Sequence, residues 1–226
     1  MDRSKMHKEF KLLMDKTGEG GAPSFLASEI DTFLNIAQEA FISKRTYGNN
    51  VRRTGFEETQ KRRDDLRTLV VSAALGSDAI ITDTDIKPNS TRLKLPDGYR
   101  HSVSEEAEVL FEGFTRRVAV TPITHDRYSK IINDPFNMPN KNSVLRLDVS
   151  NDEGDMAVEL IVGEGCSLNK YFLRYIKNPV EIAEDVSCIL PTHTHKEIVR
   201  MAVVDALENI EHPRYQSSKI ELNEIE

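Results

Sequence analysis

Two histidines with one residue between them, His193 and His195, are the first residues whose types and spacing suggest chemistry. Such a pair could supply two imidazole ligands to a zinc ion, but a zinc site needs further Cys, His or carboxylate ligands at suitable spacing. No cysteine or carboxylate at ligand spacing accompanies this pair, which stands at the start of a predicted helix. We therefore favour capping and surface roles for both side chains and predict no metal site.

A cysteine nucleophile is the second possibility, with Cys166 as the thiol and His125 or His101 as its base. This reaction needs the thiol and the imidazole within hydrogen-bond reach, which spacing alone does not supply, and no family signature surrounds Cys166. The other cysteine, Cys188, forms no CxxC motif with it, so we expect two free thiols.

Short motifs that mark nucleotide sites and common active sites are absent from the sequence, including G-x-G-x-x-G, the P-loop, G-x-S-x-G and H-E-x-x-H. Asp83 and Asp85 lack the glycine and the closing glutamate of a calcium loop. We predict no catalytic residue, no cofactor and no enzymatic activity. The alternative is a small hydrolase or nucleic-acid-processing enzyme built on Cys166 or on the histidine pair.

Charge limits the partners of the chain. The 226 residues carry 30 Lys and Arg against 37 Asp and Glu, a net charge of −7, which disfavours non-specific DNA binding. No signal-like segment begins the sequence and no run of eighteen apolar residues interrupts it, so we expect a cytoplasmic product that does not interact with membranes.

Helices are predicted near both ends of the chain. Residues 1–23 begin with a short helical possibility and continue into a glycine-rich break, which indicates a flexible arm. Residues 24–47 carry an apolar stripe at spacings of three and four, with Ser28 as a possible cap. Residues 192–212 carry the strongest stripe, opened by a Thr194-x-x-Glu197 capping box and stopped by Pro213.

A charged segment, residues 55–67, is predicted to form a further helix because acidic residues precede basic ones by four positions. Its basic residues could bind phosphate, but neighbouring carboxylates largely neutralise them, so we favour a solvated or subunit-facing surface. The interface candidates here are Arg52, Arg53, Arg62 and Arg63.

Strands are predicted between these helices. Alternating or β-branched runs cover residues 66–75, 92–95, 108–114, 117–121, 143–150, 156–162 and 170–177, and a short helix is expected at 127–132. Short turns join most of them, so the pairing should be mostly antiparallel. The predicted fold is α+β, a single domain over residues 1–212 with a helical body from both ends and a central β region.

The C-terminal tail, residues 213–226, is polar and too poor in apolar residues to build a core of its own. We expect it to order on a partner. Its interface candidates are Tyr215, Ile220, Leu222 and Ile225.

A set of short motifs follows this order along the chain: Asn35-Ile36-Ala37-Gln38, Asp134-Pro135-Phe136-Asn137-x-Pro139, Tyr175-x-Lys177-x-Pro179, Cys188-x-Leu190-Pro191 and His195-x-x-Ile198-Val199-x-x-Ala202-Val203. Together they resemble the head-to-tail connector ring proteins of crAss-like bacteriophages and, more distantly, podovirus adaptors of the tail tubular protein A group.

The resemblance implies a structural virion protein, assembled in the host cytoplasm, that forms a ring of twelve subunits below the portal. Its implied partners are other copies of itself, the portal protein and a neighbouring connector ring or tail protein. It also implies a lumen through which DNA passes without specific binding, which the acidic balance suits. The alternative within the same phage is a tail-hub component or a packaged cargo protein.

Overall fold

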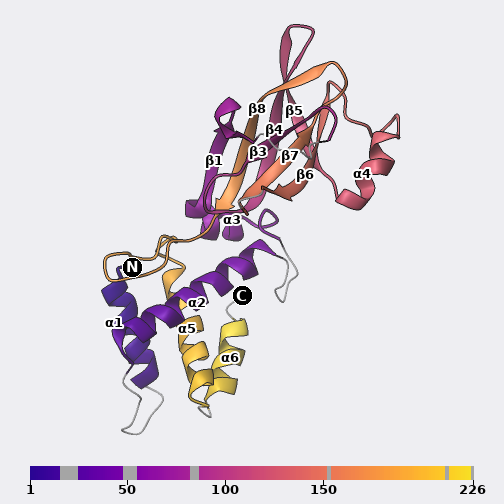
Figure 1. The fold of residues 1–226 in the computed structure, drawn as a ribbon. Coiled ribbons are helices and arrows are strands. Elements are labelled where there is room, and N and C mark those ends of the chain that lie inside the picture. The colour runs from indigo at the N-terminus through magenta and orange to yellow at the C-terminus, as the bar shows by residue number, and fades with distance from the viewer. Residues whose placement is uncertain (16–24, 48–54, 82–86, 152–153, 212–213, 225–226) are drawn as a thin grey trace. The chain divides into compact units, whose positions relative to one another are not determined.

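The computed structural model describes residues 1–15, 25–47, 55–81, 87–151, 154–211 and 214–224. It divides the chain into a helical unit, Met1–Leu69 with Pro179–Glu226, and a β unit, Val70–Asn178 (Figure 1). The single domain predicted for residues 1–212 thus contains two compact units. The chain leaves the helical unit after Leu69 and returns to it at Pro179.

The helical unit consists of α1 (Arg3–Asp15), α2 (Ala27–Thr46), α3 (Gln60–Leu66), the 3-10 turn η1 (Arg67–Leu69), α5 (His195–Asn209) and α6 (Tyr215–Glu224). Helix α5 lies at its centre and packs against α1, α2 and α6. Nine of its fifteen residues are buried, as expected for a helix with neighbours on several sides. Both ends of the chain belong to this unit (Figure 1).

Residues 3–15 do not form the loose arm that the sequence predicted. Helix α1 buries Met6, Phe10 and Met14, and Phe10 lies 5.9 Å from Phe25 and 6.3 Å from Phe33 between ring centroids. The prediction was wrong here because the few apolar residues of α1 have partners far along the chain. The glycine-rich break at 16–23 lies outside the described residues.

The β unit is one eight-stranded sheet in the order β1-β8-β4-β5-β6-β7-β3-β2. Its strands are β1 (Val70–Leu75), β2 (Ile80–Ile81), β3 (Ser90–Lys94), β4 (Tyr99–Phe111), β5 (Phe114–Pro122), β6 (Ser143–Ser150), β7 (Met156–Ile161) and β8 (Cys166–Lys177). A short 3-10 turn, η2 (Ser77–Ala79), joins β1 to β2. All pairings are antiparallel except β5 with β6, which confirms the predicted α+β class.

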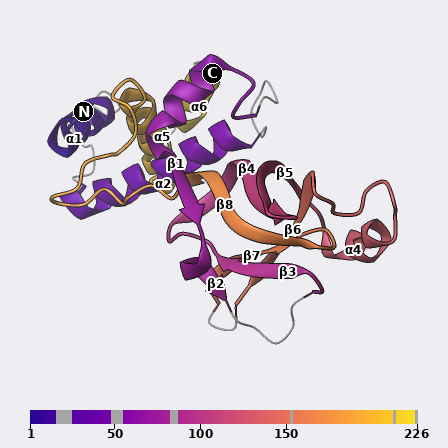
Figure 2. The ribbon, with the colours of Figure 1, turned by 90° about the horizontal axis from the view of Figure 1, so that it is seen from above.

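The sheet curls around its own core, and α4 (His125–Ile132) lies outside it beside β6 (Figure 2). Val144 and Val158 face the main core, whereas Leu145 and Ile161 face Ile131 of α4. Strands β6 and β7 are therefore covered on both faces, and long runs of their residues are buried. The predicted hairpin of these two strands is confirmed.

Several predicted boundaries and caps differ from the structure. The predicted strand at 66–75 begins only at Val70, after α3 and η1. Helix α3 begins at Gln60, where the Thr59 hydroxyl accepts from the Arg62 N–H at 3.4 Å. The capping box at Thr194 is wrong, because the Thr194 hydroxyl donates to the Pro191 carbonyl instead.

Ser28 is not the cap of α2. It lies inside the helix, where its carbonyl accepts a hydrogen bond from the Thr32 hydroxyl. The helix begins at Ala27, and the Glu29 carboxylate accepts from the Leu26 N–H at 2.7 Å. Acidic Glu29 in the first turn also suits the helix dipole.

Candidate functional site

The first motif, Asn35-Ile36-Ala37-Gln38 of α2, binds the segment that follows Pro179 in the helical unit. The Asn35 amide donates to the Ile182 carbonyl at 3.1 Å and accepts from the Ile182 N–H at 2.8 Å. Three residues along the same face of α2, the Gln38 amide donates to the Val180 carbonyl at 3.2 Å. The two side chains therefore fix a segment without regular secondary structure that lies more than 140 residues away in sequence.

Cys188 and His195 extend this hydrogen-bond set. The Cys188 thiol donates to Gln38 Oε1 at 3.0 Å, and burial raises the pKa of this thiol, so it stays protonated and unreactive. The buried His195 ring meets the Leu190 carbonyl at 2.7 Å through Nε2, which must carry the proton. Burial lowers the pKa of His195 and keeps the ring neutral.

A buried ion network joins α2, α3 and α5 in the same unit. Arg45 is 2% exposed, and it donates to Asp65 at 2.9 Å through Nε and to Glu197 at 2.7 Å through Nη2. Its guanidinium also lies 4.8 Å from the centre of the Phe41 ring. His193 contacts the other oxygen of Asp65 at 2.9 Å. These charges satisfy one another in the interior, so the network fixes how the three helices meet.

Four of the groups considered for catalysis contact neighbours outside this set. The His125 ring contacts the Asp148 carbonyl at 2.8 Å, and Cys166 pairs with Phe111 in the sheet. His193 and His195 are engaged by Asp65 and by the Leu190 carbonyl, respectively. Among the described residues, no group of three or more His, Cys, Asp or Glu could hold a metal ion.

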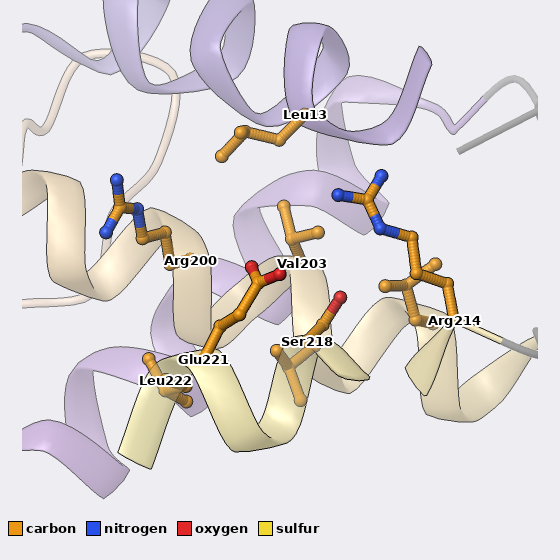
Figure 3. Close-up of a pocket in the computed structure, with 9 residues that line it drawn as sticks. Leu13, Arg200, Val203, Arg214, Ser218, Glu221 and Leu222 are labelled. Carbon is orange, nitrogen blue, oxygen red and sulfur yellow. The ribbon is translucent and has the colours of Figure 1, made fainter. Parts of the chain in front are cut away.

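A pocket of about 190 Å³ lies between α1, α5 and α6 (Figure 3). Val203, Val204 and Leu207 of α5 give it an apolar lining. Leu13 of α1 points toward it from the side opposite Val203 (Figure 3). Helix α6 adds Ser218, Glu221 and Leu222, and Figure 3 places Arg200 and Arg214 on opposite sides of the opening. The tail is thus a helix that shapes a concave surface of its own unit.

The predicted interface residues fall into different environments. Arg52, Arg53 and Ile225 lie outside the described residues. Arg62 is buried and donates to the Lys44 carbonyl at 3.0 Å, so it serves the packing of its own unit, whereas Arg63 is exposed.

On α6, Ile220 is exposed, Leu222 lines the pocket and Tyr215 accepts a hydrogen bond from Lys219 at 2.7 Å. Residues 215–224 of the tail are therefore helical in the single chain. Its role as an interface stays a prediction.

Sequence reasoning missed the polar groups that carry these interactions, although a signal was present. Gln38 and Arg45 lie on the buried face of α2 and Asn35 is half-buried beside it, and buried polar side chains nearly always have partners. A polar residue within an apolar stripe therefore marks a specific contact, although it does not identify the partner.

Another motif, Asp134-Pro135-Phe136-Asn137-x-Pro139, forms an exposed loop after α4 in the β unit. Asp134 accepts from the Phe136 N–H at 3.0 Å and from the Asn137 amide at 2.6 Å. The hydrogen bond from Asn137, together with that from Phe136, lowers the pKa of Asp134, which stays ionised. The Phe136 ring at the tip of this loop is 93% exposed.

Comparison with known proteins adds to this geometry. A model of the family described as phage tail ring protein 3/4 matches residues 1–213. Ring protein 3 of Bacteroides phage crAss001 is 26% identical over 161 residues, which cover 68% of this chain and 66% of that protein. Ring protein 4/5 of the same phage is 24% identical over 187 residues, with 80% and 75% covered. The chain thus spans just under two thirds of the first relative and three quarters of the second.

Proposed function

The chain belongs to the phage tail ring protein 3/4 family, which makes it a structural ring protein of a bacteriophage, and we propose that it forms one ring of the head-to-tail connector. The observation that carries this proposal is the family match over 213 of the 226 residues. In this proposal twelve copies form a ring, and the ring stacks below the portal or on a neighbouring ring of the neck. DNA passes through its lumen during ejection.

Charge supports the role of a conduit. A net charge of −7 gives the phosphates of passing DNA little to bind, so the DNA can move. Both signs are nevertheless dense, which suits the repeated contacts of a closed ring, where one surface of each copy meets a different surface of the next. The role requires no catalysis.

The rigid interior of the helical unit also supports a structural role. Asn35 and Gln38 fix α2 to a distant segment through part-buried hydrogen bonds and Arg45 binds Asp65 in the interior, so the unit offers a defined shape to its neighbours. Residues 213–226 are proposed to dock on an adjacent protein through the exposed side of α6, where Ile220 is 62% exposed.

The test is assembly of the purified chain alone and with the portal protein, because a connector ring can require the portal as a template. Light scattering and negative-stain imaging should show rings, or ring-shaped density added to the portal. A chain that stays monomeric and binds no portal would contradict the proposal. Removal of residues 214–226 should weaken docking, and unchanged incorporation of the shortened chain would contradict the proposed role of the tail.

A position further along the tail is the second candidate, since the family is described as a tail ring protein and its relatives are named as rings 3 and 4/5. Locating the chain in an imaged virion distinguishes the two positions. Density in the neck supports the connector ring, and density below the neck supports a tail ring.

A further inference from the structure

Phe136 is a large aromatic side chain that the β unit displays to solvent. It is 93% exposed, whereas an aromatic ring ordinarily contributes to a core. The neighbouring Met138 is 43% exposed, so the tip of the loop is apolar. These two exposed side chains on one loop offer apolar contact area to another macromolecule.

The loop that carries Phe136 is held in shape by its own hydrogen bonds. The Asp134 carbonyl accepts from the Asn137 and Met138 N–H groups at 3.1 and 2.9 Å, and its carboxylate accepts from Phe136 and Asn137. Pro135 and Pro139 restrict the backbone on either side. The backbone that carries the ring is therefore held before any partner arrives, which lowers the entropic cost of binding.

Close packing against Gly163 fixes the far end of the loop. A Cβ atom at Gly163 would stand 2.7 Å from Asn140 Cα and 3.0 Å from the Pro139 carbonyl oxygen, so only glycine allows this approach. Pro139 itself is buried. The closely packed base and the exposed tip make Phe136 a protruding side chain, called the knob below.

The pocket between α1, α5 and α6 has the size and lining that such a knob requires. Its volume is about 190 Å³, and an apolar cavity of roughly 150 Å³ is large enough to bind benzene. The side chains of Leu13, Val203 and Leu222 offer apolar contacts to a ring (Figure 3).

The net charge that lines the pocket is opposite in sign to the charge on the loop. Arg200 and Arg214 stand on opposite sides of the pocket (Figure 3), and guanidinium groups pack favourably on aromatic faces. Asp134, two residues before the knob, is ionised and would approach these cations. The pocket also contains one carboxylate, Glu221, so its lining carries a net positive charge.

We infer that Phe136 of one copy inserts into the α1/α5/α6 pocket of the next copy. The inference rests on the proposed ring, in which each copy must present two different surfaces that fit one another. This chain carries both halves of such a contact, a protruding ring and an apolar pocket.

Cross-linking between two different variants tests the contact. One chain carries Phe136→Cys and the other Ser218→Cys, both with Cys166→Ser, because Ser218 lines the pocket and Cys166 is partly exposed. The mixture should form disulfide-linked dimers under oxidation. The control replaces Phe136→Cys by Phe114→Cys, since Phe114 is 79% exposed at another place in the same unit. Equal cross-linking by this control, or none by the first pair in assembled rings, would overturn the inference.

Substitution of the knob gives a second measurement. Phe136→Ser should weaken self-association roughly 30-fold, as loss of a central aromatic anchor does, whereas Phe114→Ser should change it little. Unchanged urea unfolding of both variants shows that the fold is intact. Rings that form normally with Phe136→Ser would overturn the knob and leave the ring proposal standing. A wild-type chain that never self-associates, even with portal, would overturn both.

Discussion

Asn35 and Ile182 are joined by a pair of hydrogen bonds in which one side-chain amide satisfies both polar groups of a distant backbone unit, at 3.1 and 2.8 Å. Ile182 is 2% exposed, so water does not readily replace these bonds. The segment after Pro179 lacks a regular ladder of its own, and the α2 side chain supplies what a neighbouring strand would supply.

Asn35→Ala should therefore destabilise the chain by about 2–3 kcal/mol, because it leaves a buried N–H and a buried carbonyl without partners. Urea unfolding measures the change. Ile36→Ala is the control on the same helix, since Ile36 is 52% exposed and should cost little. Equal unfolding midpoints for the two variants would show that the amide pair does not hold the segment.

Arg45→Met should destabilise the chain by about 3–5 kcal/mol, because it leaves the carboxylate of Asp65 buried without its main partner. Arg45→Lys should recover only part of the loss, since one ammonium group cannot reproduce the separate Nε and Nη2 contacts. Thermal and urea unfolding measure both variants, with the exposed Arg63→Met as control. Full stability of Arg45→Lys would contradict the two-contact arrangement.

Asp31 links α2 to α1, and its contribution should depend on pH. It accepts from Arg3 at 2.6 Å and contacts His7 at 2.7 Å, and the hydrogen bond from Arg3 is the main cause of its lowered pKa. The folded state therefore favours the ionised carboxylate. The resulting stability is complete above the ordinary pKa of about 3.9 and is lost as the pH falls through the lowered pKa.

Asp31→Asn should accordingly cost about 1.5–3 kcal/mol near neutral pH, and the difference from wild type should shrink below about pH 4. Urea unfolding at a series of pH values measures this difference. If the difference in unfolding free energy between wild type and Asp31→Asn stayed constant at the lowest pH measured, Asp31 would contribute no ionic stabilisation.

His195 should produce a second pH dependence at higher pH. Burial lowers its pKa, so the folded state holds the neutral ring while the unfolded chain binds a proton at the ordinary pKa of about 6.5. Stability is then complete above about pH 6.5 and falls as the pH drops below it. His195→Gln should flatten the stability curve between about pH 7 and pH 5, measured by urea unfolding. Parallel curves for the two proteins would refute this assignment.

Gly163→Ala should destabilise the β unit by about 1–3 kcal/mol, since the added Cβ overlaps the Asn140 backbone, which cannot move as a flexible side chain can. Amide exchange of Met138 should accelerate because the loop base is displaced. Gly55→Ala is the control, as a Cβ there would meet only the Glu58 carboxyl group at 3.7 Å. Unchanged exchange at Met138 would show that Gly163 does not support the loop.

The periodicity of apolar residues predicts most of the regular elements of the fold. The stripe at 24–47 became α2, the alternating residues at 143–162 became the β6–β7 hairpin, and the stripe after Pro191 became α5. These patterns succeed because the repeat of a helix or strand decides which residues share one face. The predicted caps at Thr194 and Ser28 were wrong because a cap depends on the three-dimensional path of the chain, which the repeat does not report.

The sequence by itself determined the α+β class, the principal helices and hairpins, and the motifs that resemble a phage ring protein. Only the tertiary structure decided that α1 and α6 pack on α5, that Asn35 binds Ile182, and that Arg45 joins Asp65 to Glu197. The physical reason is that a periodic pattern reports that a face is buried but not what covers it. Hydrogen bonds and ion pairs need their partners within about 3 Å, and here those partners lie as far as 152 residues away in sequence.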